Sequence, residues 1–312
     1  HLSFFRELTK RILEEIKSIK PIQIILIDYP GFNLRLAKKI KVSFNIPITY
    51  YISPKFWAWK EKRIEIIRKY VDQMLVIFPF EESWYKKRGI KVKFVGHPIF
   101  DEWEPTPKHD LCNGFGLNPK KPILTLFPGS RKQELIRHLS LFISVAENLR
   151  NIKPQIQCIL GLAPEMNLDH VSMPDWILVE KTHPAKALEC ADVGLVASGS
   201  ATLEAAVFGT PMVIVYKMSM VTWWLSKLLV KTNYAGMVNI IAGKKIMPEF
   251  LQNQAISQSI TNEIYEMLSS RERQDEMAFE LLNVQQQLQG EGASNRAAQH
   301  IITLAQSTGK IP

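Results

Sequence analysis

The strongest candidate for chemistry in this sequence is a turn of small and hydroxyl residues, Ser198-Gly199-Ser200, with Glu204 close behind it. The turn separates a strand-like apolar run, Val193 to Ala197, from a helical stretch. Backbone N–H groups at such a junction can approach a phosphate closely, and the helix dipole favours its negative charge. Glu204 would then lie near a ribose hydroxyl. A structural alternative stays open, because hydroxyl and acidic residues also stabilise the start of a helix.

A second candidate is the loop Gly129-Ser130-Arg131, which follows the apolar run Ile123 to Phe127 and opens another helical stretch. A guanidinium group can bind a diphosphate through two parallel hydrogen bonds, so Arg131 could hold the charge of a departing nucleotide. Ser130 and Gln133 also fit a capping box, which is the structural alternative here. If both apolar runs belong to one sheet, the two turns face the same cleft.

Asp28 is the candidate general base, because it ends the apolar run Ile22 to Ile27 and would point toward a cleft between domains. Asp before Tyr-Pro-Gly is also ordinary turn chemistry, and the local sequence does not decide between the two. The chain has no Asp-x-Asp pair and no His/Cys cluster with metal-ligand spacing. We therefore expect a mechanism without a metal or any other cofactor.

Short apolar runs alternate with helical stretches along the chain, which is typical of parallel sheets covered by helices on both faces. This pattern predicts an α/β protein with strands within these ranges: Ile22 to Ile27, Ile46 to Ile52, Met74 to Phe78, Lys91 to Val95, Ile123 to Phe127, Ile156 to Leu160, Trp176 to Val179, Val193 to Ala197 and Met212 to Tyr216.

The segment from His97 to Pro122 is rich in proline and glycine and is typical of a linker. It separates four of the predicted strands from the other five. We expect two doubly wound domains, the first over residues 1–105 and the second over residues 106–312. The C-terminal helices could pack back on the first domain.

The formal net charge of +9 favours anionic partners such as nucleotides or an acidic membrane surface. Nucleic acid is disfavoured, because no helix-turn-helix, zinc or RRM signature accompanies the charge. Three well-separated cysteines, Cys112, Cys158 and Cys190, predict reduced packing residues and favour a cytoplasmic setting. No uninterrupted apolar run reaches the ~18 residues that a membrane span needs.

Two basic stretches with aromatic residues predict contact with an anionic lipid surface. Residues 205–248 contain no Asp or Glu and include Trp223, Trp224 and Lys227. Residues 55–93 contain eleven Lys or Arg against five acids and include Trp57 and Trp59. We therefore expect a protein that binds peripherally to a membrane.

Taken together, these residues make the chain resemble the lipid-A-disaccharide synthase family of glycosyltransferases. The Ser-Gly-x-Ala-x-x-Glu turn recurs loosely across two-domain transferases, whereas the Ser-Pro-x-x-Trp-Ala-Trp and Leu-Val-Lys-Thr segments are far more specific. The matching segments are Asp28-Tyr-Pro-Gly-Phe-Asn33, Ser53-Pro-Lys-Phe-Trp-Ala-Trp59, Phe94-Val-Gly-His-Pro98, Phe127-Pro-Gly-Ser-Arg131, Ser198-Gly-Ser-Ala-Thr-Leu-Glu204, Trp224 to Thr232, Asn239-Ile-Ile-Ala-Gly243 and Gly292-Ala-Ser-Asn-Arg296.

The resemblance implies the GT-B architecture, in which two Rossmann-like domains face each other across a cleft. It also implies an inverting transfer from UDP-2,3-diacylglucosamine to the 6-hydroxyl of 2,3-diacylglucosamine 1-phosphate, releasing UDP. By position, Asp28 would be the base, while Arg131 and Asn239 would contact UDP. The acyl chains would explain a basic, tryptophan-bearing surface that binds the anionic inner membrane of a Gram-negative bacterium. A homodimer is a further expectation.

Members of the family begin with a first strand and a Gly-Glu-x-Ser-Gly-Asp loop, and this sequence matches neither. The first domain is therefore expected to lack its N-terminal portion. Two other interpretations stay open. One is a non-catalytic protein that binds UDP or anionic lipid without turnover, and the other is a different GT-B enzyme that uses UDP-N-acetylglucosamine. The segment with Trp57 and Trp59 argues against the second.

Overall fold

The computed structural model describes residues 2–58, 61–101, 103–168, 171–219 and 232–307. These residues form two compact units. The first unit holds the described residues up to Asp101 together with those from Leu288 onward, and the second holds the described residues between Trp103 and Gln287. The chain therefore enters the second unit at Trp103 and returns to the first unit at Leu288.

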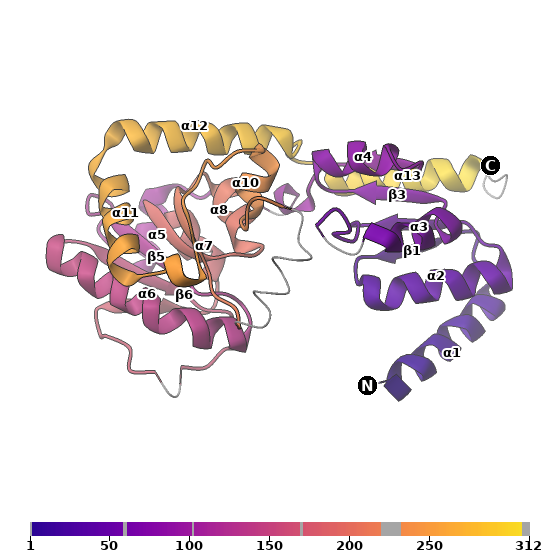
Figure 1. The fold of residues 1–312 in the computed structure, drawn as a ribbon, viewed down its shortest axis with the longest axis horizontal. Helices are drawn as coiled ribbons and strands as arrows, with labels where there is room; N and C mark the ends of the chain where they lie inside the picture. The colour runs from indigo at the N-terminus through magenta and orange to yellow at the C-terminus, as the bar shows by residue number, and fades with distance from the viewer. Residues whose placement is uncertain (1, 59–60, 102, 169–170, 220–231, 308–312) are drawn as a thin grey trace. The chain divides into compact units, whose positions relative to one another are not determined.

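The first unit is built on a four-stranded parallel sheet in the order β1-β2-β3-β4. Its strands are nearly all apolar, and β3 is buried at every position. Residues of the helices and of the connecting loops complete the core, and Figure 1 shows the helices around the sheet. The elements are α1 (Leu2–Ile19), β1 (Ile24–Ile27), α2 (Pro30–Phe44), β2 (Ile48–Tyr51), the 3-10 turn η1 (Glu61–Arg63), α3 (Ile64–Tyr70), β3 (Gln73–Val76), α4 (Pro79–Lys86), β4 (Val92–Phe94), η2 (Pro98–Phe100) and α13 (Ala293–Ser307).

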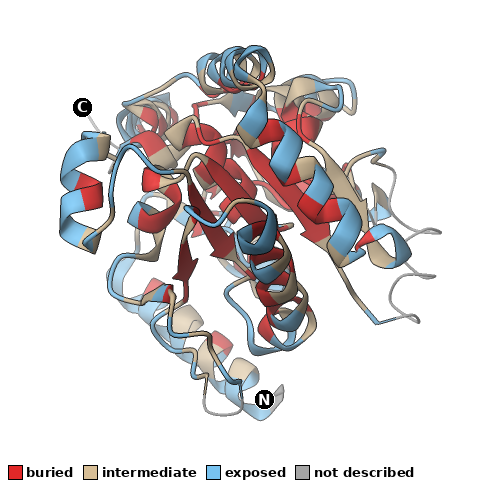
Figure 2. Ribbon diagram, turned by 90° about the vertical axis from the view of Figure 1, so that its left-hand side faces the viewer, coloured by how far each residue is buried: buried red, intermediate tan, exposed pale blue. Residues whose placement is uncertain are grey.

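The second unit is built on a six-stranded parallel sheet in the order β10-β9-β8-β5-β6-β7. Its central strands are buried almost throughout, whereas the helices expose one face (Figure 2). The elements are α5 (Lys108–Phe115), β5 (Ile123–Phe127), α6 (Lys132–Ile152), β6 (Gln157–Gly161), β7 (Ile177–Glu180), α7 (Pro184–Cys190), β8 (Val193–Ala197), α8 (Ala201–Phe208), β9 (Met212–Tyr216), α10 (Met237–Ala242), β10 (Glu249–Leu251), the turn η3 (Gln252–Gln254), α11 (Ser257–Ser269) and α12 (Arg271–Gln287).

The strand order of the second sheet contains one reversal that matters for function. From β5 the chain moves outward through β6 to β7, and then crosses back to place β8 on the other side of β5. The loops that follow β5 and β8 therefore diverge onto opposite faces of the sheet. Ligands of open α/β sheets bind in the crevice at such a switch point, beyond the carboxyl ends of the strands.

All nine predicted strands are present and parallel, and the predicted α/β class is confirmed. Two details were wrong. The strand β10 was missed, because it has three residues and begins with Glu249. The predicted linker contains the helix α5, which Pro107 precedes and Gly116, with a φ of +68°, ends. Proline and glycine here mark the ends of a helix rather than an unstructured segment.

The helix α5 is held by its apolar face, because Leu111 and Cys112 pack in one cluster with Ile123 and Cys190. The sulfur atoms of Cys112 and Cys190 lie 3.4 Å apart as free thiols. Cys158 is also free and buried. The three cysteines are thus packing residues, as the sequence predicted.

The helix α13 joins two segments that lie far apart in the sequence. The Asp101 carboxylate accepts hydrogen bonds from the backbone N–H groups of Gly292, Ala293 and Ser294 at 2.7–3.0 Å, which caps the start of α13. Arg296 donates from Nε to the carbonyl oxygen of Val95 at 2.7 Å. The motif at residues 94–98 and the motif at residues 292–296 are therefore in direct contact in the first unit.

Candidate functional site

The two phosphate-binding candidates lie on adjacent strands of the second unit. β5 and β8 are paired from Leu124 to Phe127, so the loops after Phe127 and Ala197 leave the same edge of the sheet. This edge is the switch point of the sheet. The sequence could not show that the two strands are neighbours, and the structure places their carboxyl ends side by side.

The Ser198 turn leaves its first backbone donors open. Ser200 stands before the first residue of α8 without forming a side-chain cap. Among the residues that the structure describes, no acceptor takes the N–H of Gly199, Ser200 or Ala201. Gly199 and Ser200 are exposed, and a Cβ atom added at Gly199 would meet nothing within 4 Å. The Ser200 side chain therefore does not cap α8, which was the structural alternative for this turn.

Hydroxyl groups of this turn instead fasten it to the segment that precedes α10. Ser198 Oγ donates to the carbonyl oxygen of Ala235 at 2.8 Å. Thr202 Oγ1 donates to the carbonyl oxygen of Gly199 at 2.9 Å and accepts from the N–H of Met237 at 3.2 Å. Ser198 is thus an anchor whose hydroxyl already has an acceptor, while Gly199 and Ser200 present the free N–H groups.

Glu204 is half-buried in the first turn of α8. Burial raises the pKa of its carboxyl group. Within the described part of the chain its carboxylate oxygens accept no hydrogen bond. This carboxylate can therefore accept hydrogen bonds from hydroxyl groups of a ligand.

The loop after β5 presents Arg131 to solvent. The Arg131 side chain is 80% exposed, and its guanidinium contacts the Glu134 carboxylate at 3.0 Å. The same carboxylate accepts from the Arg131 N–H at 3.3 Å, so Arg131 and Glu134 form the start of α6. The capping box of Ser130 and Gln133, which was the structural alternative here, is not formed, because Arg131 and Glu134 form it one residue later. Ser130 is exposed, and Gly129 supplies a φ of +113° that other residues rarely adopt.

The family resemblance implied that Asn239 contacts UDP, and the structure places its side chain inside the second unit. Its side chain is fully buried and forms four hydrogen bonds. Nδ2 donates to the Met247 carbonyl oxygen and to Glu249 Oε1, while Oδ1 accepts from the N–H groups of Ile246 and Met247, all at 2.8–2.9 Å. Every donor and acceptor of the amide is therefore used inside the protein. The structure makes Asn239 a scaffold residue, and a direct contact with UDP would require these bonds to break.

Glu249 extends this scaffold to the Ser198 turn. Its carboxylate accepts from the backbone N–H groups of Ala235 and Gly236 at 2.9–3.0 Å. Ala235 in turn accepts from Ser198. A continuous chain of hydrogen bonds thus runs from Asn239 through Glu249 to the turn that presents the free N–H groups.

We expect Asn239→Ala to act through stability rather than through direct binding. The change leaves two backbone N–H groups and one carbonyl oxygen without their partner, which should lower the free energy of unfolding by about 2–3 kcal/mol. Urea titration measures this loss, and Asn262→Ala, at an exposed position of α11, serves as the control. Wild-type stability combined with a raised KM for the sugar nucleotide would restore Asn239 as a direct contact.

Asp28, the candidate base, lies at the carboxyl end of β1 in the first unit with a strained backbone. Asp28 and Tyr29 both have left-handed conformations, with φ of 45° and 44°. The Asp28 N–H donates to Tyr51 O at 2.9 Å, and its carbonyl oxygen accepts from Tyr50 Oη at 2.5 Å and Asn33 Nδ2 at 2.8 Å. Its side chain is exposed. Strain of this kind costs on the order of 1 kcal/mol per residue and is concentrated at functional sites.

Trp57 was predicted to contact a membrane, and this prediction does not fit its position. Its side chain is buried, its indole N–H donates to Glu81 Oε1 at 2.9 Å, and its ring packs edge-on against Phe80. A tryptophan held in this way has no surface to offer to lipid. The other predicted membrane contacts, Trp59, Trp223, Trp224 and Lys227, lie outside the described residues.

Glu81 is a residue that the sequence did not single out. It is almost completely buried, and its carboxylate accepts from Ser53 Oγ at 2.6 Å, from Trp57 and from the Phe78 N–H at 3.2 Å. Burial raises its pKa to about 7, although these hydrogen bonds oppose the shift. Glu81 therefore fixes the segment Ser53-Pro-Lys-Phe-Trp57, which follows β2 next to Asp28.

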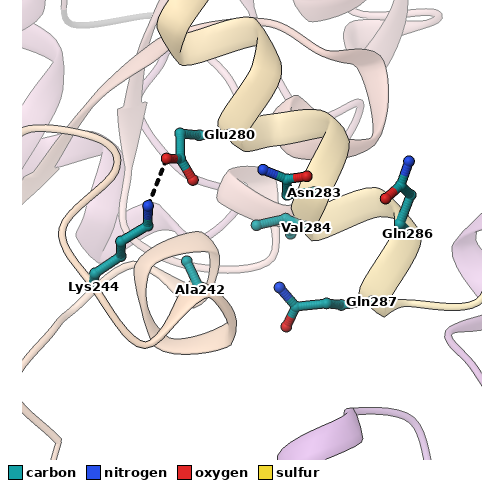
Figure 3. A pocket seen from close by; sticks show the side chains of 7 residues that line it. All are labelled: Ala242, Lys244, Glu280, Asn283, Val284, Gln286 and Gln287. Carbon is teal, nitrogen blue, oxygen red and sulfur yellow. Dashed lines mark hydrogen bonds and ion pairs between the residues drawn. The ribbon is translucent and has the colours of Figure 1, made fainter.

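A pocket of about 470 Å³ lies elsewhere in the second unit, between the C-terminal end of α10 and α12 (Figure 3). Amide side chains and the ion pair of Lys244 with Glu280, at 2.5 Å, line it. None of the predicted site residues contributes to its wall. The Ser198 turn contacts the opposite, N-terminal end of α10, so this pocket is separate from the candidate site.

Within the described residues, no group of three His, Cys, Asp or Glu side chains could hold a metal ion. No helix among them is long and apolar enough to cross a membrane.

Comparison with known sequences gives a consistent result. A family model described as lipid-A-disaccharide synthetase matches residues 1–303. The chain is 36% identical over 293 residues to the lipid-A-disaccharide synthase of Coxiella burnetii (strain CbuG_Q212), covering 92% of this chain and 77% of the relative. It is 39% identical over 306 residues to that of Syntrophus aciditrophicus (strain SB), covering 94% of this chain and 78% of the relative.

Solved structures resemble the fold at low sequence identity. The co-structure of S. aureus MnaA with UDP has a TM-score of 0.67 at 13% identity, covering 99% of this chain and 82% of that one. The calicheamicin glycosyltransferase CalG4 has a TM-score of 0.59 at 14% identity, covering 95% and 76%. These similarities confirm the predicted GT-B class of fold.

Proposed function

The chain belongs to the lipid-A-disaccharide synthetase family, and from that premise we propose that it joins UDP-2,3-diacylglucosamine to 2,3-diacylglucosamine 1-phosphate. The family makes it a glycosyltransferase of lipid A biosynthesis that acts on lipid A precursor sugars. The observation that carries the finer proposal is the set of free N–H groups at the Ser198 turn. This turn follows β8, and the loop of Arg131 follows the neighbouring strand β5 at the switch point of the second sheet.

On the donor side, the N–H groups of Gly199, Ser200 and Ala201 would bind the diphosphate of UDP. Negative charge on this diphosphate grows as the sugar departs, so donors and cations that are already in place lower the barrier. Arg131 is exposed and can turn from Glu134 to the diphosphate. The unpaired Glu204 carboxylate would accept hydrogen bonds from ribose hydroxyls.

On the acceptor side, Asp28 would take the proton of the 6-hydroxyl as that oxygen attacks the anomeric carbon. The bond from the anomeric carbon to the diphosphate breaks in the same displacement, and UDP leaves with the electron pair. Attack from the face opposite UDP inverts the configuration of the sugar. The locked backbone of Asp28 supports this role, because it fixes where an exposed carboxylate is presented.

Arg131→Ala should impair use of the sugar nucleotide. The change removes a charge-assisted contact, so kcat/KM for UDP-2,3-diacylglucosamine should fall by the equivalent of ~1.5–3 kcal/mol. Steady-state kinetics measure this effect, and Lys132→Ala, at the neighbouring exposed position, is the matched control. Equal kinetics in Arg131→Ala and the wild type would remove Arg131 from the site.

Asp28→Asn should lower turnover much more than it changes binding. Asparagine tolerates the left-handed backbone and keeps the size of the side chain, but it cannot take a proton. We expect kcat to fall roughly 100-fold or more, while the affinity for UDP stays near that of the wild type. Asp110→Asn, an exposed carboxylate on α5, should change neither quantity. Undiminished kcat in Asp28→Asn would exclude it as the base.

We also propose that the protein docks on an anionic membrane surface through its basic segment of residues 205–248. The absence of acidic residues there, the net charge of +9 and the acyl chains of the proposed substrates support the proposal. The expected homodimer stays a prediction.

Vesicle co-sedimentation tests the docking surface. The protein should bind phosphatidylcholine vesicles that contain phosphatidylglycerol, and 0.5 M NaCl should release it by screening. Combining Trp223→Ala, Trp224→Ala and Lys227→Glu should weaken binding at least roughly tenfold, since each basic residue contributes about 1 kcal/mol. Lys121→Glu is the control at an exposed position. Equal binding to vesicles without phosphatidylglycerol would contradict the proposal.

A further inference from the structure

His138 occupies an unusual place on the buried face of α6. Its side chain is fully buried and packs against Phe142, with ring centroids 5.8 Å apart. Its Nδ1 lies 3.2 Å from the carbonyl oxygen of Pro128, and its Nε2 accepts from the backbone N–H of Lys217 at 3.0 Å. Both ring nitrogens therefore bond to the main chain of other segments.

These two partners determine where the imidazole carries its proton. The backbone N–H of Lys217 can only donate, so Nε2 must be an unprotonated acceptor. The carbonyl oxygen of Pro128 can only accept, so Nδ1 must carry the hydrogen. The neutral Nδ1–H tautomer satisfies both partners. A proton on Nε2 would place two donors against each other in a buried site.

The two bonded segments flank the Ser198 turn. Pro128 follows β5 and begins the loop that presents Arg131, while Lys217 follows β9. β5 and β9 are the two neighbours of β8, so His138 connects the segments on either side of the strand that leads to Ser198. Gln252 holds the next residue, Met218, through its backbone N–H and carbonyl groups at 3.3 Å each.

We propose that His138 is a positioning residue for the sugar nucleotide. By bonding Pro128 and Lys217 at once, it holds the loop of Arg131 in register with the segment that follows β9. This inference rests on the proposed UDP site. It goes beyond that site by assigning a role to a buried side chain that touches no substrate.

The electrostatic surroundings favour the neutral form. Burial lowers the pKa of His138, and the charge of Lys217 acts in the same direction, while the Glu134 carboxylate and hydrogen bonds to main-chain atoms of Glu134 and Pro128 oppose it. A histidine whose pKa is lower in the folded state than its unfolded value near 6.5 destabilises the fold on acidification. The stability that neutral His138 gives to the fold is fully present above the unfolded pKa. This stability is lost as the pH falls through the folded pKa.

Variants that keep one bond or neither test the inference. Asparagine can replace the Nδ1–H donor toward Pro128, glutamine can replace the Nε2 acceptor toward Lys217, and leucine replaces neither. We expect His138→Leu to raise the Kd for UDP, measured by calorimetry, roughly tenfold or more, with smaller increases in the asparagine and glutamine variants. KM for the acylated acceptor should stay within about twofold. His109→Gln, at an exposed position of α5, should leave all values unchanged.

A second measurement does not depend on variants or on turnover. In wild-type protein labelled with ¹⁵N-histidine, His138 should show a protonated Nδ1 and an unprotonated Nε2 at pH 7. Its Nε2 should become protonated over the same pH range in which UDP affinity falls.

The outcomes separate this inference from the proposed function. A wild-type protein that does not bind UDP would overturn the proposed function and the inference with it. Wild-type UDP binding that is equally tight in folded His138→Leu would overturn the inference alone. So would a protonated Nε2 at pH 7. If no variant folds, the wild-type pH titration decides, and UDP affinity that does not follow the protonation of His138 contradicts the role.

Discussion

Backbone N–H groups at the start of a helix need acceptors, and the start of α8 leaves three of them without a partner among the described residues. Their position follows from topology, because β8 lies on the far side of β5 from β6 and its following turn opens at the switch point of the sheet. Small residues keep this turn accessible, and Gly199 has free space around its missing Cβ. Hydrogen bonds from Ser198 and Thr202 to the segment before α10 hold this turn in place.

The residues of the site therefore fall into two groups, which differ in exposure and in hydrogen bonding. Gly199, Ser200 and Arg131 are exposed and present donors or charge to a ligand. Asn239 and His138 are fully buried, and their hydrogen bonds end on main-chain atoms or on the half-buried Glu249 carboxylate. Buried polar groups that are fully satisfied make a structure rigid and unique. The presenting residues consequently depend on a polar scaffold that a ligand need never touch.

The sequence predicted the fold well because nine strands form near-continuous apolar runs with clear boundaries. β10 was not predicted, because it has three residues and no such run. The helix α5 was not predicted, because its flanking Pro107 and Gly116 were interpreted as part of a linker. The turns of the site were found through their local chemistry. Whether β5 and β8 are neighbours depends on strand order, which no local pattern encodes.

At single residues, the sequence did not reveal which partners hold a buried side chain, because those partners lie outside the local motif. Trp57 suits a membrane surface by composition, yet Glu81 takes its N–H in the interior. Asn239 suits a ligand contact by resemblance, yet Met247 and Glu249 use its amide. His138 did leave a signal, because it is a polar residue among the apolar residues Leu135, Leu139 and Phe142 on one face of α6. A polar side chain at a buried position needs a hydrogen-bond partner in the interior.

The most direct test of the account is a map of backbone amide chemical shifts during titration with UDP. If the open helix start binds the diphosphate, the largest changes will occur at Gly199, Ser200 and Ala201, with further changes from Gly129 to Arg131. Changes confined to Lys244, Asn283 and Gln287, which line the pocket between α10 and α12, would contradict the assignment and move the nucleotide to that pocket.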